Sequence, residues 1–336
     1  MLNIINHRIK FFSFSIFLLI VSLFFIFFGK INLGIDMTGG TQAEYTYNGN
    51  LNIEEINKKF ENIKNIFNEK NDFIINSTSI YGITGEQKVG VVVGYDSHLS
   101  EEKLQEVKTE FREITNNFLL ESNNTFEESS FVNIGKSFGD YIKKTAKYTL
   151  IIALFSIAIY ILFAFGKVVN GVKSYVFALV TGVTLLHDIL LSVGIYIIIS
   201  NFYHEFQIDT YTITALLTIL GYSINDTIVV FDRIRANLRE FGGRGKSLEE
   251  IVSLSLNQTI VRSLFTSLTL VFVLITIFFF GPEALRGFIL IMIFGTIFGT
   301  YSSIFIASPL LYSLTKNNKI EIYKEIKISD EDKIIV

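Results

Sequence analysis

Ionisable side chains inside long apolar runs are the residues of this sequence best suited to chemistry. A charge at the centre of a lipid bilayer costs about 2.5–3.5 kcal/mol on insertion scales, so its presence there needs a reason. Three places qualify: Asp226, Arg262 and the adjacent pair His187 and Asp188. Groups of this kind typically bind and release protons or hold helices together.

Asp226 lies beyond the midpoint of the apolar run 210–231, within the segment GYSINDT at 221–227. Hydrocarbon disfavours the charged carboxylate, whereas a nearby cation favours it. A carboxyl group held between these two influences can gain and lose a proton at working pH. The alternative is an Asp that bonds to a neighbouring helix and never titrates. We expect Asp226 to be a proton carrier, with Tyr222, Ser223 and Asn225 as supporting polar residues.

Arg262 directly precedes the apolar run 263–280 and is the candidate partner for Asp226. Ser247 and Glu250 have the spacing of a capping box, which predicts a helix that starts near Leu248 and continues into the membrane. Arg262 would then lie in the inner half of the bilayer. The other interpretation is an interfacial arginine that extends to the lipid headgroups, and spacing leaves both open.

His187 and Asp188 are central in the run 175–199. Adjacent residues on a helix point about 100° apart, so the two cannot both face one partner, and a mutual His–Asp relay is not expected. Polar bonds between packed helices are the alternative. A metalloprotease has no support, because the sequence contains no HExxH helix.

Glycines mark two further features. The segment GIDMTGGT at 34–41 permits a tight turn between the first apolar run and the chain that follows it. We expect Asp36, Gly39 and Gly40 to form this hinge, with Asp36 as a turn former rather than a ligand. Gly295 and Gly299 have a spacing that allows close contact between helices.

Membrane-spanning helices must position these residues. The chain of 336 residues is 50% hydrophobic and 18% charged, with a mean hydropathy of +0.44. A helix needs about 20 apolar residues to cross about 30 Å of hydrocarbon. The first run has no small-residue cleavage site after it, which favours a retained anchor over a signal peptide. We expect six spans, at 11–28, 148–165, 175–199, 210–231, 263–280 and 288–314.

A polar region separates the first run from the second. Its periodicity predicts strands and helices in the order β-α-β-β-α-β, which is the ferredoxin-like arrangement. The expected elements are strands 41–47, 73–81, 88–95 and 125–134, with helices over 53–67 and from residue 100 to about 118. The expected domains are 1–30 (N-terminus and first span), 31–144 (inserted domain), 145–314 (spans two to six, with a loop at 232–262) and 315–336 (tail).

Lysine and arginine gather in alternate connections: the N-terminus, the 166–174 loop, the 232–262 loop and the tail. The opposite short loops, 200–209 and 281–287, hold only Arg286. The positive-inside rule therefore predicts cytoplasmic termini and an extracytoplasmic 31–144 domain. Lys143, Lys144 and Lys147 run against the rule, but long translocated domains largely escape it.

Composition narrows the function. A formal net charge of −3 gives no support to nucleic-acid binding, and the absence of cysteine removes disulfides, thiolate metal sites and thiol catalysis. We expect no enzyme activity, cofactor or metal.

Longer motifs carry a family resemblance over nearly the whole chain. Segment 34–41 is similar to the GxDFxGGT signature that SecD and SecF proteins share, and segment 221–235 resembles the GYSxNDxIVVxDRIRE block that is typical of SecF. His187 and Asp188 match the HD pair of the family's third helix. Residues 257–259, Arg262 and 266–267 resemble the segment that enters its fifth helix. Met37 replaces the usual Phe, Ala236 replaces the Glu of the DRIRE run, and the loop near 242–245 is slightly lengthened.

The resemblance implies a six-helix half of an RND-type transporter in the bacterial inner membrane. It implies partnership with SecD, association with the SecYEG channel and often YajC, and contact with unfolded preprotein and the lipid bilayer. The family uses the proton-motive force to complete export on the outer side of the membrane. Its proton-pathway Asp and Arg fall on Asp226 and Arg262.

Two rival functions are a stand-alone RND-type exporter of a small molecule or lipid, and a passive assembly subunit. Such exporters usually carry two six-helix halves in one chain, whereas this sequence shows one. A passive subunit would keep its activity when Asp226 is replaced with Asn.

Overall fold

The computed structural model describes residues 4–48, scattered positions between 58 and 68, 75–83, 87–95, 101–120, 126–166, 172–203, 206–242, 245–282 and 285–316. The start of the expected helix 53–67, residues 84–86 between the second and third expected strands, Lys167 and nearly all of the tail lie outside this part. The elements are α1 (Arg8–Phe28), α2 (Ile35–Thr38), β1 (Gly40–Tyr47), β2 (Ile75–Ile83), β3 (Lys88–Tyr95), α4 (Glu101–Leu120), β4 (Phe126–Ile134), α5 (Lys136–Ala164), α6 (Ser174–Phe202), α7 (Thr210–Phe241), α8 (Leu248–Phe280), α9 (Arg286–Ser302), the π-helical turn η2 (Ser303–Ala307) and α10 (Ser308–Thr315).

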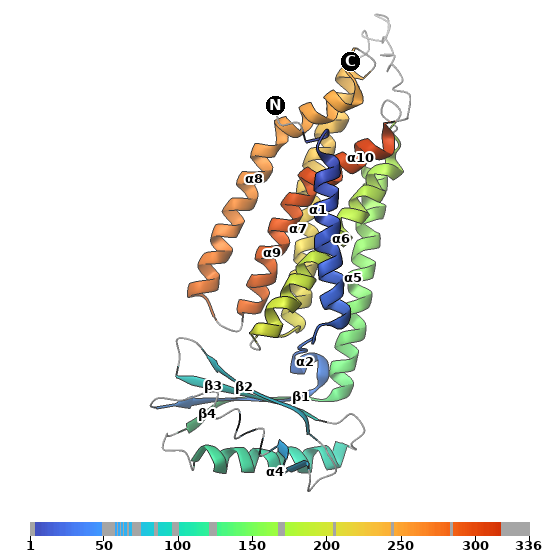
Figure 1. Cartoon of the computed structure of the whole chain (residues 1–336). Coiled ribbons are helices and arrows are strands. Elements are labelled where there is room, and N and C mark those ends of the chain that lie inside the picture. Colours follow the sequence, from blue (N-terminus) through green and yellow to red (C-terminus); the bar gives the residue numbers. More distant parts are fainter. Residues whose placement is uncertain are drawn as a thin grey trace, which may run out of the picture.

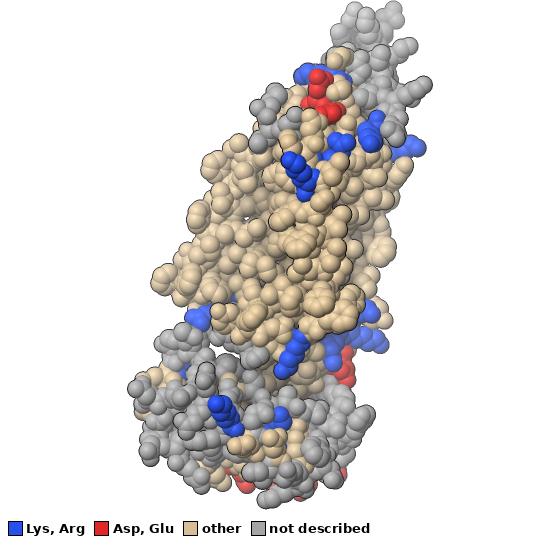
Figure 2. All heavy atoms as spheres, in the orientation of Figure 1, with Lys and Arg blue, Asp and Glu red and all other residues tan. Residues whose placement is uncertain are grey.

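Six helical segments in the described residues are long and apolar enough to cross a membrane, which confirms the predicted number of spans. They are α1, α5, α6, α7, α8 and the continuous run α9–η2–α10. The helices form one elongated bundle (Figure 1). On the face shown in Figure 2, charged side chains gather near the ends and leave an uncharged band between them, as a bilayer requires.

Several helices extend past the predicted spans. Helix α5 begins at Lys136, ahead of the expected domain boundary at residue 144, and α7 continues to Phe241. Within the predicted connection 232–262, α7 therefore occupies the residues up to Phe241, and α8 begins at Leu248, where the capping box predicted a helix start. Ile234 and Leu238 explain the extension of α7, because they share one face of the helix and are fully buried.

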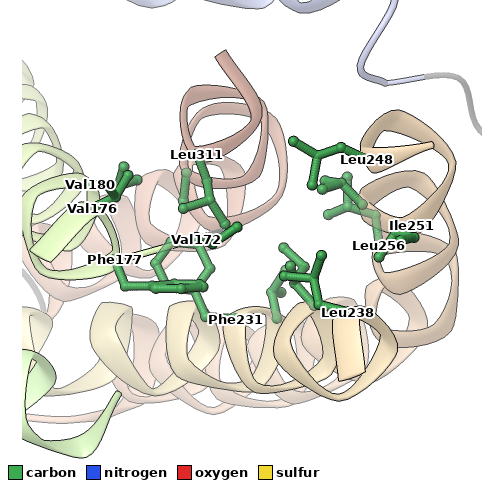
Figure 3. Packing of buried hydrophobic residues seen from close by; sticks show 14 of the residues in the cluster. Val172, Val176, Phe177, Val180, Phe231, Leu238, Leu248, Ile251, Leu256 and Leu311 are labelled. Carbon is green, nitrogen blue, oxygen red and sulfur yellow. The ribbon is translucent and has the colours of Figure 1, made fainter. Parts of the chain in front are cut away.

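Apolar packing closes the end of the bundle at which α1 begins (Figure 3). Phe177 of α6 and Phe231 of α7 meet edge to face, with ring centroids 5.2 Å apart. Residues of α8 and α10, among them Ile251 and Leu311, complete the same cluster. This cluster holds α6, α7 and α8 together at this end of the bundle.

The inserted region forms a four-stranded antiparallel sheet in the order β2-β3-β1-β4. It lies at the end of the bundle opposite the start of α1, and α4 covers the face that points away from the bundle (Figure 1). Alternate residues of β1 and β3 form the core with Phe60 and Phe111. The described positions between 58 and 68 are helical.

Close contact between α9 and α7 depends on Gly295. A Cβ atom at this position would collide with three side-chain carbons of Ile219, which is 1% exposed. A Cβ at Gly182 of α6 would meet nothing within 4 Å.

We therefore expect Gly295→Ala to destabilise the bundle by about 1–3 kcal/mol through overpacking, despite the better helix propensity of alanine. Gly182→Ala is the matched control and should equal or exceed the parent in stability. The measurement is the temperature at which the detergent-solubilised protein loses its monodisperse peak in size-exclusion chromatography. Equal temperatures for the two variants would contradict the assigned contact.

Candidate functional site

Asp226 lies at the middle of α7 and is 3% exposed. The helix starts at a capping box in which the Asp209 side chain accepts from the Thr212 backbone and Thr212 reciprocates. Because α7 ends at Phe241 rather than Phe231, Asp226 stands about midway along the helix. The helix buries a carboxyl group where water is scarce.

Hydroxyl groups from two other helices surround Asp226. Ser267 Oγ of α8 donates to Asp226 Oδ2 at 3.3 Å. Ser267 Oγ in turn accepts hydrogen bonds from Tyr222 OH at 3.1 Å and from Thr300 Oγ1 of α9 at 2.5 Å. Asp226 is therefore linked through one serine to α8 and α9.

Ser267 has one proton and two acceptors for it. Its Oγ lies 3.3 Å from Asp226 Oδ2 and 2.8 Å from the carbonyl oxygen of Ser263. A charged Asp226 attracts the Ser267 proton. A neutral Asp226 can donate its own proton to Ser267 and leave the serine proton to the carbonyl, provided that the Thr300 hydroxyl turns to the Thr296 carbonyl, 2.8 Å away, because a hydroxyl oxygen accepts two hydrogen bonds. The geometry suits a hydroxyl that reverses its direction with the state of Asp226.

Arg262 is not joined to Asp226. No ion pair within 4.0 Å links them among the described residues, and Arg262 is exposed. The predicted helix from Leu248 through the membrane is present as α8. On that helix Ser263 and Ser267 are buried, and Arg262 is rotated about 100° from Ser263. The exposure of Arg262 favours the interfacial interpretation within this chain, and its pairing with Asp226 stays a prediction.

His187 and Asp188 contact each other, contrary to expectation. His187 Nδ1 lies 2.9 Å from Asp188 Oδ1. The angular argument excludes a shared third partner, but two neighbouring side chains can still lean together along the helix surface. Asp188 Oδ2 accepts from Ser223 Oγ of α7 at 2.5 Å and from Ser302 Oγ of α9 at 2.8 Å.

Asn225, which was expected among the supporting polar residues, lies on the exposed face of α7. The sequence interpretation missed Thr300 and Ser302 of α9. Their signal was a cluster of hydroxyl residues inside an apolar run, which predicts helix contacts but not which helix is contacted. Within the described residues, no group of three or more His, Asp or Glu side chains could hold a metal ion.

The hinge segment reaches α7 directly. Gly39 and Gly40 have φ angles of 72° and 149°, in the region that favours glycine. Asp36 Oδ2 accepts from the Thr210 backbone N–H at 2.6 Å and also from the Thr210 hydroxyl. Asp36 is therefore more than the turn former that was expected, because it binds the N-terminal end of the helix that carries Asp226.

Neighbouring backbone contacts strengthen this junction. Gly34 N–H donates to the Ile208 carbonyl at 2.9 Å, and Ile208 N–H donates to the Asn32 carbonyl at 2.7 Å. On the other side, a Cβ at Gly139 of α5 would lie 2.7 Å from the Met37 carbonyl oxygen. The segment between α1 and β1 is thus held between the start of α7 and the start of α5.

The chain is similar to known proteins over most of its length. The family described as protein export membrane protein SecD/SecF, C-terminal, matches residues 114–317. Protein translocase subunits SecF of Thermobaculum terrenum and Sebaldella termitidis are each 33% identical to the chain. The first match covers 96% of this chain and 97% of the relative. The second covers 95% and 93%.

Solved structures agree with these matches. The crystal structure of SecDF from Thermus thermophilus, described as a translocon-associated membrane protein, superposes with a TM-score of 0.74 at 26% identity. The match covers 93% of this chain and 38% of the SecDF chain. A second SecDF structure, in a super-membrane-facing form, gives a TM-score of 0.61.

Proposed function

The chain belongs to the SecF family of protein translocase subunits, and we propose that it acts with SecD to complete protein export on the outer side of the membrane, driven by the proton-motive force. Its place as an auxiliary subunit of Sec export follows from the family. The proton coupling, the roles of individual residues and the partners are our proposals.

Asp226 is the observation that carries the proton coupling. It is a buried carboxyl group at the middle of a membrane helix. Its partner Ser267 belongs to α8 and accepts a hydrogen bond from Thr300 of α9. Intramembrane carboxylates typically mark ion or proton pathways. Arg262, Tyr222 and Ser223 complete the proposed pathway. Arg262 is exposed on α8 and available to a partner subunit.

The proposed cycle begins when Asp226 takes a proton from the outer side. Ser267 then turns toward the Ser263 carbonyl, and the link between α7, α8 and α9 changes. Because Asp36 binds the start of α7, a shift of α7 moves the hinge and the sheet beyond it. One charge crossing 100 mV releases about 2.3 kcal/mol, which can bias a two-state equilibrium about fiftyfold.

The domain assignments belong to the same proposal. We assign 31–144 to an extracytoplasmic ferredoxin-like domain, supported by the sheet order β2-β3-β1-β4. Residues 1–30, 145–314 and 315–336 form the first span, the remaining spans and a tail, with both termini in the cytoplasm of a bacterium and the spans in its inner membrane. The proposed partners are SecD, SecYEG, YajC and unfolded preprotein.

The test is gradient-dependent export by vesicles that contain SecYEG, SecD and this chain. We expect the chain to increase the yield of fully translocated preprotein only while a proton gradient is present, and an ionophore to abolish that increase because it removes the energy source. Vesicles without the chain are the control. An increase that survives the ionophore would indicate a passive assembly role, and efflux of a small molecule without SecD would indicate the exporter.

A further inference from the structure

A second buried polar cluster lies on α6, outside the Asp226 network. Asp188 is 0% exposed and accepts hydrogen bonds from Ser223 and Ser302 on one oxygen. Its other oxygen faces His187 Nδ1 at 2.9 Å. Two hydroxyl donors and one imidazole nitrogen converge on one carboxyl group, an arrangement that suits an acceptor-only carboxylate when Nδ1 carries the proton.

One atom of this cluster is left without a partner. His187 is 5% exposed, and its Nε2 makes no hydrogen bond to any residue that the structure describes. A buried polar atom without a partner costs about 1–3 kcal/mol. A cluster that only held helices together would gain by replacing this nitrogen with carbon, so Nε2 needs another explanation.

Helix register shows what lies beside His187. Helices α1 and α6 run in parallel: Asn32 Nδ2 donates to the Ser200 carbonyl at 2.9 Å, and a Cβ at Gly194 would collide with Ser22. Seven residues earlier on each helix, and so on the same faces, come His187 and Ser15. Ser15 is 3% exposed and donates to Tyr301 OH at 3.3 Å.

We propose that His187 and Asp188 form a second proton-binding site in the bundle, with His187 Nε2 as the atom that takes the proton. The Nε2 lone pair forms an N–H bond with a proton from the aqueous phase, and no bond of the protein breaks. The charge of the pair changes from −1 to zero, so the adjacent carboxylate compensates the imidazolium. Ser15 and Tyr301 carry hydroxyl groups on the side of α6 that faces α1.

Both carboxyl groups act on the same two helices. Ser223 and Asp226 are one turn apart on α7, and Thr300 and Ser302 share α9. A Cβ at Gly299 would lie 3.0 Å from that of Ser223, so α7 and α9 are in close contact at this level. A charge change at either site therefore alters the link between α7 and α9.

Few other ionisable groups face this layer. Of the elements packed on α6, α7 contributes Tyr222 and Asp226, and α9 contributes Tyr301. Helix α10 contributes only Tyr312, more than two turns further along, and the apolar part of α1 and the turn η2 contribute none. Helix α5 contributes Tyr148 and Tyr160, which are 54% and 61% exposed. Asp226 is thus the acidic side chain of these elements that lies in the layer of the pair, one helical turn from Ser223.

The protonation of His187 can be followed directly, because the chain has only four histidines and three of them can be replaced. Replacing His7, His98 and His204 with Gln leaves His187 as the single reporter. The full chain, assembled with SecD in lipid nanodiscs, would be labelled with ¹⁵N in the imidazole ring and studied by NMR between about pH 5 and 9. We expect the signal to change from a neutral to a doubly protonated ring, and we expect Asp188→Asn to remove the protonated form.

One neutral tautomer over the whole range would overturn the proposal. The same titration in an Asp226→Asn background separates this inference from the proposed function on which its physiological role rests. A titrating His187 in that background supports the second site whether or not Asp226 drives export. If Asp226→Asn exports normally, the proposed function fails while the site stands.

Export supplies a second readout. His187→Gln keeps a polar side chain of similar reach but cannot take a proton. We expect it to change the pH at which gradient-driven export is half-maximal, because the variant lacks the nitrogen that takes the proton. If His187 and Asp188 only held helices together, His187→Gln would lower thermal stability and leave that pH unchanged. An unchanged pH profile would therefore overturn the proposed site.

Discussion

Asp226→Asn is expected to abolish gradient-driven export by this chain while the protein still inserts into the membrane and binds SecD. Asparagine keeps the size and polarity of the side chain and can still accept a hydrogen bond from Ser267, which lies 3.3 Å from Asp226 Oδ2. It cannot exchange a proton. The bias of about fiftyfold that one proton supplies at 100 mV would therefore disappear.

The measurement is the yield of translocated preprotein in vesicles with and without a proton gradient. Asp226→Glu is the matched control, because it restores a carboxyl group and should recover part of the gradient response. Copurification with SecD checks that both variants assemble. Full export by Asp226→Asn, with a response to the gradient equal to that of the parent, would eliminate the proposed carrier.

Asp36→Ala is expected to separate proton uptake from export. The substitution removes the two hydrogen bonds that Thr210 donates to Asp36. It also removes one of the two carboxylates at the positive N-terminal end of α7, where Asp209 remains as the N-cap. Hydrogen bonds to charged groups contribute about 1.5–3 kcal/mol, comparable to the energy of one proton. Export should fall to the level seen without a gradient because α7 can move without pulling the hinge.

Asp140→Asn is the matched control for Asp36→Ala. Asp140 is an acidic residue near the start of α5 that forms an ion pair with Lys143 at 3.0 Å, and its side chain is 53% exposed. Exposed pairs contribute about 0–1 kcal/mol, so this variant should export normally. Gradient-driven export by Asp36→Ala at the level of Asp140→Asn would show that the contact with Thr210 does not transmit movement.

The sequence determined the architecture because its signals are local. Run length and hydrophobicity set the number of spans, since about 20 apolar residues are needed to cross the bilayer. Alternation and helical spacing set the order of strands and helices between α1 and α5, including the alternate buried valines of β3. The cost of burying a carboxyl group singled out Asp226 without knowledge of its surroundings.

Only the tertiary structure decided which groups meet. Neighbouring helices set the rotation of each helix about its axis, and sequence spacing does not fix that rotation. It brought Ser267 and Thr300 to Asp226, left Arg262 exposed and joined Ser302 to Asp188. The contact of Asp36 with Thr210 spans 174 residues of chain. No local pattern encodes such a pairing, because it arises when the hinge and the start of α7 pack at the same end of the bundle.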